Sequence, residues 1–494
     1  MSNNQTSFKN TVKNTSIFGG VQLINVFINI LKGKFISMFL GSYGMGVNGL
    51  LQSPINLIKT ITGLGLSLSA VRNLSEAVGE GNENSLEVKR TVTIIRKLFI
   101  LTGIFGGLVT FIFAPQLSSW SFGNSDYNWS FRWLSISILL MSINEGQNTL
   151  LRGLRYIPSI VKSSVIGSVL GLFTSIPLYY FYGVNGIVPA LIISALIATS
   201  LSWFFTRKIK SSQQKLTYSG IYDESLDMIK MGLMLVIAIF VGSLTKFIIN
   251  LFIGRIGSIN DVGLYNAAIS ISSQYIGFIL TSLSVDYFPR LAAVNKFVDK
   301  TNKIVNEQIE VVVLLATPLL IFMILTAPLM IKIMLTSEFL VVTDFIRFVA
   351  IGSFFQVTSF SIGYISFAKN DKYFYLLLEG GLSNLLQLVC SLTAYYYWGL
   401  NGLGYSFIVI YFSYLILVLF FTKQRYQFLL FNNTRKKIIV SFIFLLSSLL
   451  ITTLLTATQS VLIGCLILVT SIYYTYRQLE SQMGISLKNI FKRK

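Results

Sequence analysis

Histidine is absent from this chain of 494 residues, and cysteine occurs only twice. Without histidine, no histidine-based catalytic triad, no histidine metal ligand and no imidazole proton relay is possible. Cys390 and Cys465 both lie in apolar runs, so neither a four-cysteine metal site nor a disulfide framework is predicted. Acidic residues are scarce too: 19 Asp and Glu stand against 39 Lys and Arg, a net charge of +20.

Charged residues make up only 12% of the chain, whereas hydrophobic residues make up 53%. Ordinary soluble domains carry about 25% charged residues. A soluble fold could not bury this much apolar surface, so the composition predicts an all-α integral membrane protein. It excludes a cytosolic enzyme, a secreted disulfide scaffold and a DNA-binding module. We therefore expect no nucleic-acid partner, and attribute the positive charge to membrane topology.

Fourteen apolar segments are long enough to cross a bilayer core, which takes about 20 helical residues. They are residues 17–40, 48–70, 92–114, 131–151, 157–182, 186–206, 231–254, 263–288, 309–335, 345–368, 373–398, 402–422, 438–457 and 461–476. The loops between them are short. Any function is therefore expected within the helical bundle.

The basic residues alternate between successive connections. With the N-terminus inside, the inner connections hold 31 of the 39 Lys and Arg, while the outer ones hold Arg132, Arg255, Lys332 and Arg347. Basic residues collect on the cytoplasmic side of membrane proteins. The pattern therefore predicts fourteen crossings with both termini cytoplasmic.

An internal repeat appears at an offset of 216 or 217 residues. The sequence GVNG at 183–186 matches GLNG at 399–402, and Gly46 falls on Gly263. Gly146, Arg152, Arg155 and Tyr156 fall on Gly363, Lys369, Lys372 and Tyr373. Each match is weak, but all lie at equivalent helix ends. They predict two six-helix halves related by an axis along the membrane normal.

The repeat divides the chain into four parts. We predict an N-terminal half at 1–206, a cytoplasmic linker at 207–230, a C-terminal half at 231–422, and two further helices with a basic tail at 423–494. Parallel halves of this kind commonly surround a central cavity that opens to alternate sides. A transporter is the favoured interpretation, and a duplicated scaffold without transport is the alternative.

Several short stretches resemble a known family. They are FGNSDY at 122–127, LLRGLRY at 150–156, VGLYNAA at 262–268, SVDYFPRL at 284–291 and GYISFAKNDKYFYLLLEG at 363–380. These stretches and the helix count resemble the polysaccharide transporter branch of the multidrug/oligosaccharidyl-lipid/polysaccharide (MOP) exporter superfamily, specifically the Wzx-type O-antigen flippases. The resemblance implies movement of an undecaprenyl-diphosphate-linked oligosaccharide from the cytoplasmic to the periplasmic leaflet of the bacterial cytoplasmic (inner) membrane. It also implies membrane lipids, and a polysaccharide polymerase with a chain-length regulator, as candidate partners.

Polar residues recur three or four positions apart in four segments, which places them on one helix face. Segment 17–40 carries Gln22, Asn25, Asn29 and Lys32; segment 48–70 carries Gln52, Asn56 and Lys59; segment 231–254 carries Lys246 and Asn250; and segment 263–288 carries Asn266, Ser270, Ser273 and Gln274. We expect the three lysines to make the cavity electropositive and to bind an anionic lipid diphosphate. The amides would line the same cavity, and interhelical hydrogen bonds are the alternative.

Glu145 is the clearest acid inside a predicted helix, and Arg152 follows on the same face. It could couple transport to a proton or Na⁺ gradient, or it could simply pair with Arg152 or Lys59. No cofactor or metal is expected. Three other acids, Asp286, Glu310 and Glu379, are expected at the membrane interface.

Two other functions compete with the flippase. A cation-coupled drug antiporter of the same superfamily shares the twelve-helix core, but predicts sites lined by acids. A membrane glycan polymerase or transferase needs acids or histidines at a membrane face, and often a sizeable outer loop. Neither alternative suits this charge pattern as well, and no catalytic residue is predicted.

Overall fold

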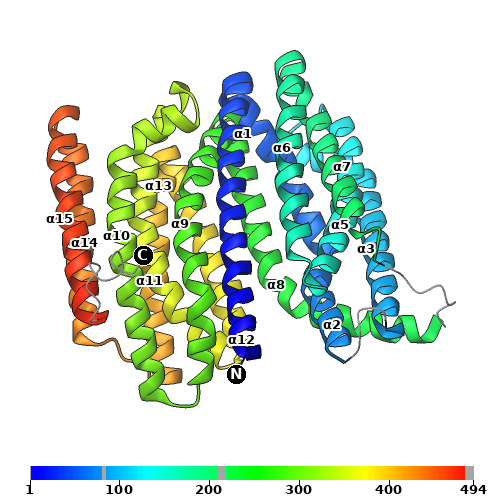
Figure 1. The fold of residues 1–494 in the computed structure, drawn as a ribbon. Coiled ribbons are helices and arrows are strands. Elements are labelled where there is room, and N and C mark those ends of the chain that lie inside the picture. The colour runs from blue at the N-terminus through cyan, green and yellow to red at the C-terminus, as the bar shows by residue number, and fades with distance from the viewer. Residues whose placement is uncertain (1, 81–84, 210–217, 484–494) are drawn as a thin grey trace. The chain divides into compact units, whose positions relative to one another are not determined.

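The computed structural model describes residues 2–80, 85–209 and 218–483, and all secondary structure in these residues is helical (Figure 1). The α-helices are α1 (Ser2–Thr62), α2 (Leu66–Glu80), α3 (Leu86–Ile112), α4 (Ala114–Phe122), α5 (Asn128–Gly153), α6 (Ile157–Tyr182), α7 (Ile187–Thr206), α8 (Tyr218–Ile256), α9 (Ile259–Ala293), α10 (Val298–Met334), α11 (Thr343–Ala368), α12 (Lys372–Tyr375), α13 (Ser383–Tyr426), α14 (Asn432–Leu454) and α15 (Ala457–Met483). Two 3₁₀ segments, η1 (Gly183–Gly186) and η2 (Ser337–Val342), and one π-helical segment, η3 (Leu376–Leu382), complete the described chain.

The predicted number of crossings is confirmed. Within the described residues, nine helical segments are long and apolar enough to span a membrane. Three of these nine, Ile24–Thr62, Ile157–Thr206 and Lys372–Tyr426, each contain a break that divides them into two crossings. Helices α5 and α9 are also long enough to cross. The total is fourteen, in an all-α multi-pass membrane protein.

Single glycines turn the chain between crossings. Gly41, Gly183 and Gly399 have φ values of 62°, 54° and 58°, a backbone conformation that other residues rarely adopt. Three residues after Gly183 and Gly399, Gly186 and Gly402 lie directly against the carbonyl group eight residues earlier in the chain, leaving no room for a Cβ atom. The two GxNG motifs therefore have the same geometry, which explains why both glycines recur at the repeat offset.

The contacts divide the chain into two compact units, Met1–Gly263 and Leu264–Lys494. Unit 1 contains helix α8, which packs against α1 and α2, although the repeat assigns α8 to the second half. A unit defined by contacts differs from a unit defined by sequence repetition. The predicted domain boundaries and the cavity between the halves therefore remain predictions.

Unit 1 has two apolar cores. One contains Leu51 and Ile55 of α1 together with Phe131 of α5. The other contains Leu66 and Leu74 of α2, with partners from α3 and α5. Between membrane-spanning helices these large side chains stabilise the cores by close packing, because lipid tails are as apolar as leucine.

In unit 2, α14 packs against α10 (Figure 1), and a buried ion pair joins the two helices. The Lys437 Nζ atom lies 2.6 Å from Glu310 Oε2, and both side chains are less than 7% exposed. Thr434 donates a further hydrogen bond to Glu310 Oε1 at 2.6 Å, and Thr475 of α15 donates to the Leu314 carbonyl at 2.9 Å. The Glu310 carboxylate is therefore buried in the protein, where a cation 127 residues away compensates it. Its expected position at the membrane interface remains a prediction.

We expect Lys437→Met to lower the free energy of unfolding by about 3–5 kcal/mol, because it leaves the Glu310 carboxylate buried without a cation. Thermal unfolding of the protein in detergent measures this effect. Lys436→Met is the matched control, because Lys436 is the exposed neighbour on the same helix. Equal melting temperatures for the two variants would show that the ion pair does not hold α14 in place.

Candidate functional site

The second crossing ends earlier than the sequence predicts, and its end forms a cavity. A continuous helix was expected to residue 70, but α1 stops at Thr62 and α2 begins at Leu66. Leu64 and Gly65 between them have φ values of 49° and 65°, which an α-helix cannot contain. The break separates α1 from α2, which packs against α5. Residues on both sides of the break line a cavity of about 280 Å³ in unit 1.

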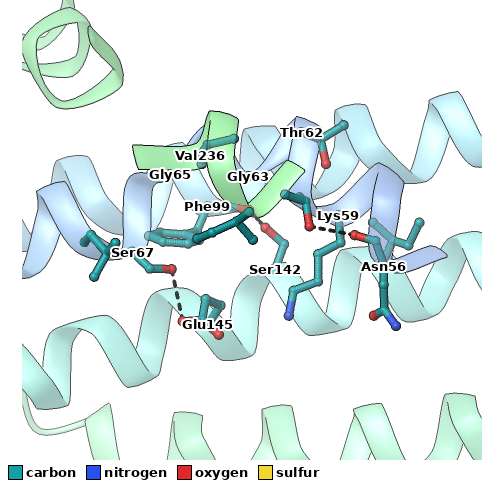
Figure 2. A pocket seen from close by; sticks show the side chains of 14 residues that line it. Asn56, Lys59, Thr62, Gly63, Gly65, Ser67, Phe99, Ser142, Glu145 and Val236 are labelled. Atoms are coloured by element: carbon teal, nitrogen blue, oxygen red, sulfur yellow. Dashed lines mark hydrogen bonds between the residues drawn. The ribbon is translucent and has the colours of Figure 1, made fainter. Parts of the chain in front are cut away.

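Lys59 of α1 and Glu145 of α5 both line this cavity (Figure 2). Glu145 accepts a hydrogen bond from Ser67 of α2 at 3.0 Å, and its carboxylate lies 3.6 Å from the Arg152 guanidinium. The remaining lining residues are Asn56, Thr60, Thr62, Gly63, Gly65, Leu68, Phe99, Ile138, Ser142, Val236 and Ile239. The wall thus combines apolar surface with hydroxyl, amide and charged groups, as ligand sites do.

The two charged groups of the cavity differ in their partners. Glu145 pairs with Arg152, which is one of the alternatives that the sequence left open. Lys59 has no carboxylate within ion-pair distance among the residues that the structure describes. A cation that is not ion-paired with an acid favours binding of an anion. The cavity is therefore suited to hold an anionic group beside Lys59.

The other predicted cavity cations lie elsewhere. Lys32 is half-buried on α1, and Lys246 is exposed on α8; neither lines the cavity around Lys59. Asn250, one turn after Lys246, is buried and donates a hydrogen bond to Ser53 of α1 at 2.9 Å. Within the described residues, the structure does not bring the three lysines into one pocket. Their common role as one electropositive surface remains a prediction.

The polar residues of α1 serve more than one purpose. Asn25 donates to Ser164 of α6 at 3.0 Å and accepts from Ser168 at 3.2 Å, so it joins two helices. Asn29 is exposed, and Gln52 donates to Asn48 within its own helix at 2.7 Å. The Gln22 side chain lies outside the described residues. Of the predicted amide lining, only Asn56 contributes to this cavity.

In unit 2, two predicted amides lie on α9. Asn266 and Gln274 are both partly buried, and the Gln274 side-chain oxygen has no hydrogen-bond partner in the described structure. Neither lines the cavity of unit 1. Their contribution to a polar wall remains a prediction.

The sequence did not identify Glu379 as an internal acid. It was expected at the membrane interface, but it lies in the π-helical segment η3 and accepts a hydrogen bond from Tyr414 of α13 at 2.7 Å. A Cβ atom on Gly363 would lie 2.7 Å from the Glu379 carboxylate, so glycine at that position makes room for it. π-Helical turns often mark functional positions. The expected position of Glu379 at the membrane interface remains a prediction, and the side chain of Asp286 lies outside the described residues.

A second charged group closes the turn between α11 and α12. Asp371 accepts hydrogen bonds from Arg425 Nε at 2.7 Å, the Tyr426 hydroxyl at 2.9 Å and the Phe374 amide at 3.3 Å. Partial burial opposes ionisation of this carboxyl, but the three hydrogen bonds outweigh it and hold the pKa of Asp371 below its ordinary value. The ionised form is therefore the one that stabilises the turn.

We expect this turn to lose its stabilisation in acid. Because the pKa of Asp371 is lower in the folded protein, its contribution is complete above the unfolded pKa of about 3.9. It disappears as the pH falls through the lowered value. Asp371→Asn should therefore reduce the melting temperature in detergent at neutral pH, and the difference from wild type should shrink below about pH 4. A difference that stayed constant to about pH 3 would assign the effect to the shape of the side chain and not to its charge.

A protein-family model described as "Polysaccharide biosynthesis protein" matches residues 46–344, a span that includes the cavity-lining helices. The chain belongs to this family. The Lipid III flippases of Escherichia coli (strain K12) and Shigella flexneri are each 23% identical to it over 373 residues, which cover 74% of this chain and 87% of each relative.

Two solved structures show the fold of this polysaccharide biosynthesis protein. The Lipid II flippase MurJ in an inward closed conformation matches 95% of the chain and 99% of its own length, with a TM-score of 0.71 and 14% identity. An inward-facing multidrug resistance MATE transporter matches 82% of the chain and 94% of its own length, with a TM-score of 0.68 and 16% identity. The family match confirms the predicted resemblance to polysaccharide transporters, and the two structures show that the chain shares its fold with a flippase and with a MATE transporter of the MOP superfamily.

Proposed function

We propose that this protein moves an undecaprenyl-diphosphate-linked oligosaccharide, an O-antigen or a related repeat unit of a surface polysaccharide, from the inner to the outer leaflet. The membrane would be the bacterial cytoplasmic membrane, with both chain termini on the cytoplasmic side. Membership of the polysaccharide biosynthesis family supports this proposal, as does the similarity to the Lipid III flippases.

The observation that carries the proposal is the cavity around Lys59. A lipid-linked oligosaccharide has an anionic diphosphate between an apolar chain and a hydroxyl-rich glycan. The lone ammonium of Lys59 suits the diphosphate, while Asn56, Ser67 and Ser142 offer hydrogen-bonding groups to hydroxyls. The substrate therefore has a counterpart in this cavity for its charged and its polar part.

We propose further that Glu145 couples the movement to a proton or Na⁺ gradient. A carboxylate inside a membrane helix is costly unless it is paired, and such residues commonly belong to ion pathways. Glu145 is paired with Arg152, and both side chains remain partly exposed. A proton or Na⁺ can therefore reach the carboxylate and compete with Arg152 for it.

Reconstitution tests the function directly. Purified protein in proteoliposomes should move a fluorescent undecaprenyl-diphosphate oligosaccharide between leaflets, measured as quenching by a reagent that cannot cross the membrane. Vesicles that carry the same lipid as a monophosphate test the role of the diphosphate, and slower movement is expected there. If neither lipid moves but a cationic dye is exported against a proton gradient, the protein is a drug antiporter like the MATE transporters that share its fold. Gene neighbours encoding a polysaccharide polymerase or a chain-length regulator would support the proposed partners.

A further inference from the structure

Two glycines meet where the outer part of α1 crosses the beginning of α9. A Cβ atom on Gly46 would overlap the backbone carbonyl of Ile259, and a Cβ atom on Gly263 would overlap the carbonyl of Ser42. Backbone atoms cannot move aside as the end of a flexible side chain can. The two segments are therefore in contact with no side chain between them, and both belong to unit 1.

The crossing is reciprocal. Gly263 lies 217 positions after Gly46, and Ile259 lies 217 positions after Ser42, so both pairs follow the offset of the internal repeat. Gly46 lies against the carbonyl of Ile259, and Gly263 lies against the carbonyl of Ser42, so each contact is the repeat equivalent of the other. A contact that is the same from both sides lies on a local twofold axis. The equivalent segments of the two repeats thus face each other at this point.

Hydrogen bonds from α8 to α1 and α4 stabilise the chain near the crossing. Asn250 of α8 donates to Ser53 of α1 at 2.9 Å, and both side chains are buried. At the end of α8, the Arg255 guanidinium donates hydrogen bonds to the carbonyl groups of Ser119 and Trp120 in α4. These contacts hold α8 against α1 and α4, and they thereby position the chain that leads from α8 to Gly263.

We propose that the Gly46–Gly263 crossing is the closed outer gate of the transport pathway. The inference rests on the proposed function, because a lipid-linked glycan that reaches the outer leaflet needs these helix ends to separate. The alternating charge pattern places this end of both helices outside. Contacts between backbones at small residues are close but individually weak, since they consist of packing and Cα–H···O interactions. At these two glycines the gate therefore closes through backbone packing.

Alanine at Gly46 or at Gly263 should favour the open gate, because a methyl group does not fit between the backbones. We expect the ratio of open to closed protein to rise about tenfold or more. The reporter is Leu50→Cys, one turn after Gly46 on α1 and only 2% exposed, in protein whose Cys390 and Cys465 are replaced by serine. A membrane-impermeant maleimide added outside should label this reporter faster in either alanine variant. Gly33→Ala is the matched control on α1, because a Cβ atom there meets nothing within 4 Å.

Wild-type labelling rates in both Gly46→Ala and Gly263→Ala would overturn the proposal. Size-exclusion elution of each variant shows that it is folded; if Gly46→Ala fails this criterion, Gly263→Ala carries the test, because the crossing is reciprocal. Faster labelling combined with slower flipping supports a gate that must close in every cycle. The labelling experiment needs no substrate. A wild-type protein that flips no glycan would refute the proposed function, and the labelling rates would still test the gate.

Discussion

Lys59→Glu is expected to abolish flipping of the lipid-linked oligosaccharide while the protein still inserts into the membrane. Lys59 is the cation of the cavity in unit 1, and the substitution puts a negative charge where the proposed diphosphate binds. A like-charge contact costs several kcal/mol, and about 3 kcal/mol already corresponds to more than a hundredfold loss of binding. The rate of quenching of the reconstituted fluorescent substrate is the measurement.

Three further variants show whether charge at this position is what matters. Lys59→Ala should slow flipping less than Lys59→Glu, and Lys59→Arg should keep part of the activity, because it keeps the charge but changes the hydrogen-bond geometry. Lys97→Glu is the control, since Lys97 is exposed on α3 and outside the cavity. Full activity of Lys59→Glu, at equal protein levels, would rule out binding of the diphosphate at Lys59.

The second large effect is expected at Glu145. Glu145→Gln keeps the hydrogen bond with Ser67 possible but removes the charge that pairs with Arg152. If Glu145 carries the coupling ion, flipping should slow about tenfold or more and become insensitive to an imposed proton or Na⁺ gradient. A tenfold loss corresponds to about 1.4 kcal/mol of barrier. Initial rates with and without each gradient provide the measurement.

Arg152→Gln separates coupling from simple pairing. It removes the cation but leaves the Glu145 carboxylate, so the gradient should still accelerate flipping. Glu76→Gln is the matched control, because Glu76 also pairs with an arginine, Arg72 at 2.7 Å, but on the exposed face of α2. If Glu145→Gln only lowers stability and its flipping still responds to the gradient, Glu145 serves as an ion-pair partner alone.

Hydropathy and charge predicted the crossings well, because both properties are local. The bounds 157–182 agree with α6 at both ends, and the two GxNG motifs occur at equivalent turns. The break between α1 and α2 was missed, because Leu64 is an ordinary helix former and its positive φ depends on the surrounding packing. The short helix α4 and the π-helical segment η3 were missed for the same reason.

The candidate site was predicted only in part. Helical spacing showed that Asn56 and Lys59 share a face, and the structure places Glu145 in the same cavity. Spacing does not show which helices are neighbours. It therefore could not show that Ser67 reaches Glu145, or that Lys32 and Lys246 lie away from Lys59. The adjacent glycines after Glu379, at 380 and 381, were the sequence signal for an irregular helix that could have been used.

The ion pair between Glu310 and Lys437 can form only late in the synthesis of the chain. A ribosome adds about 5–20 residues per second, and 127 residues separate the two side chains. Glu310 is therefore synthesised about 6–25 seconds before Lys437, the cation that pairs with it. During that time α10 lacks the partner that makes its burial favourable, so its inner end should stay at the membrane surface until α14 arrives. The last two helices then complete the folding of unit 2, and a chain that ends before α14 should be a substrate for membrane proteases.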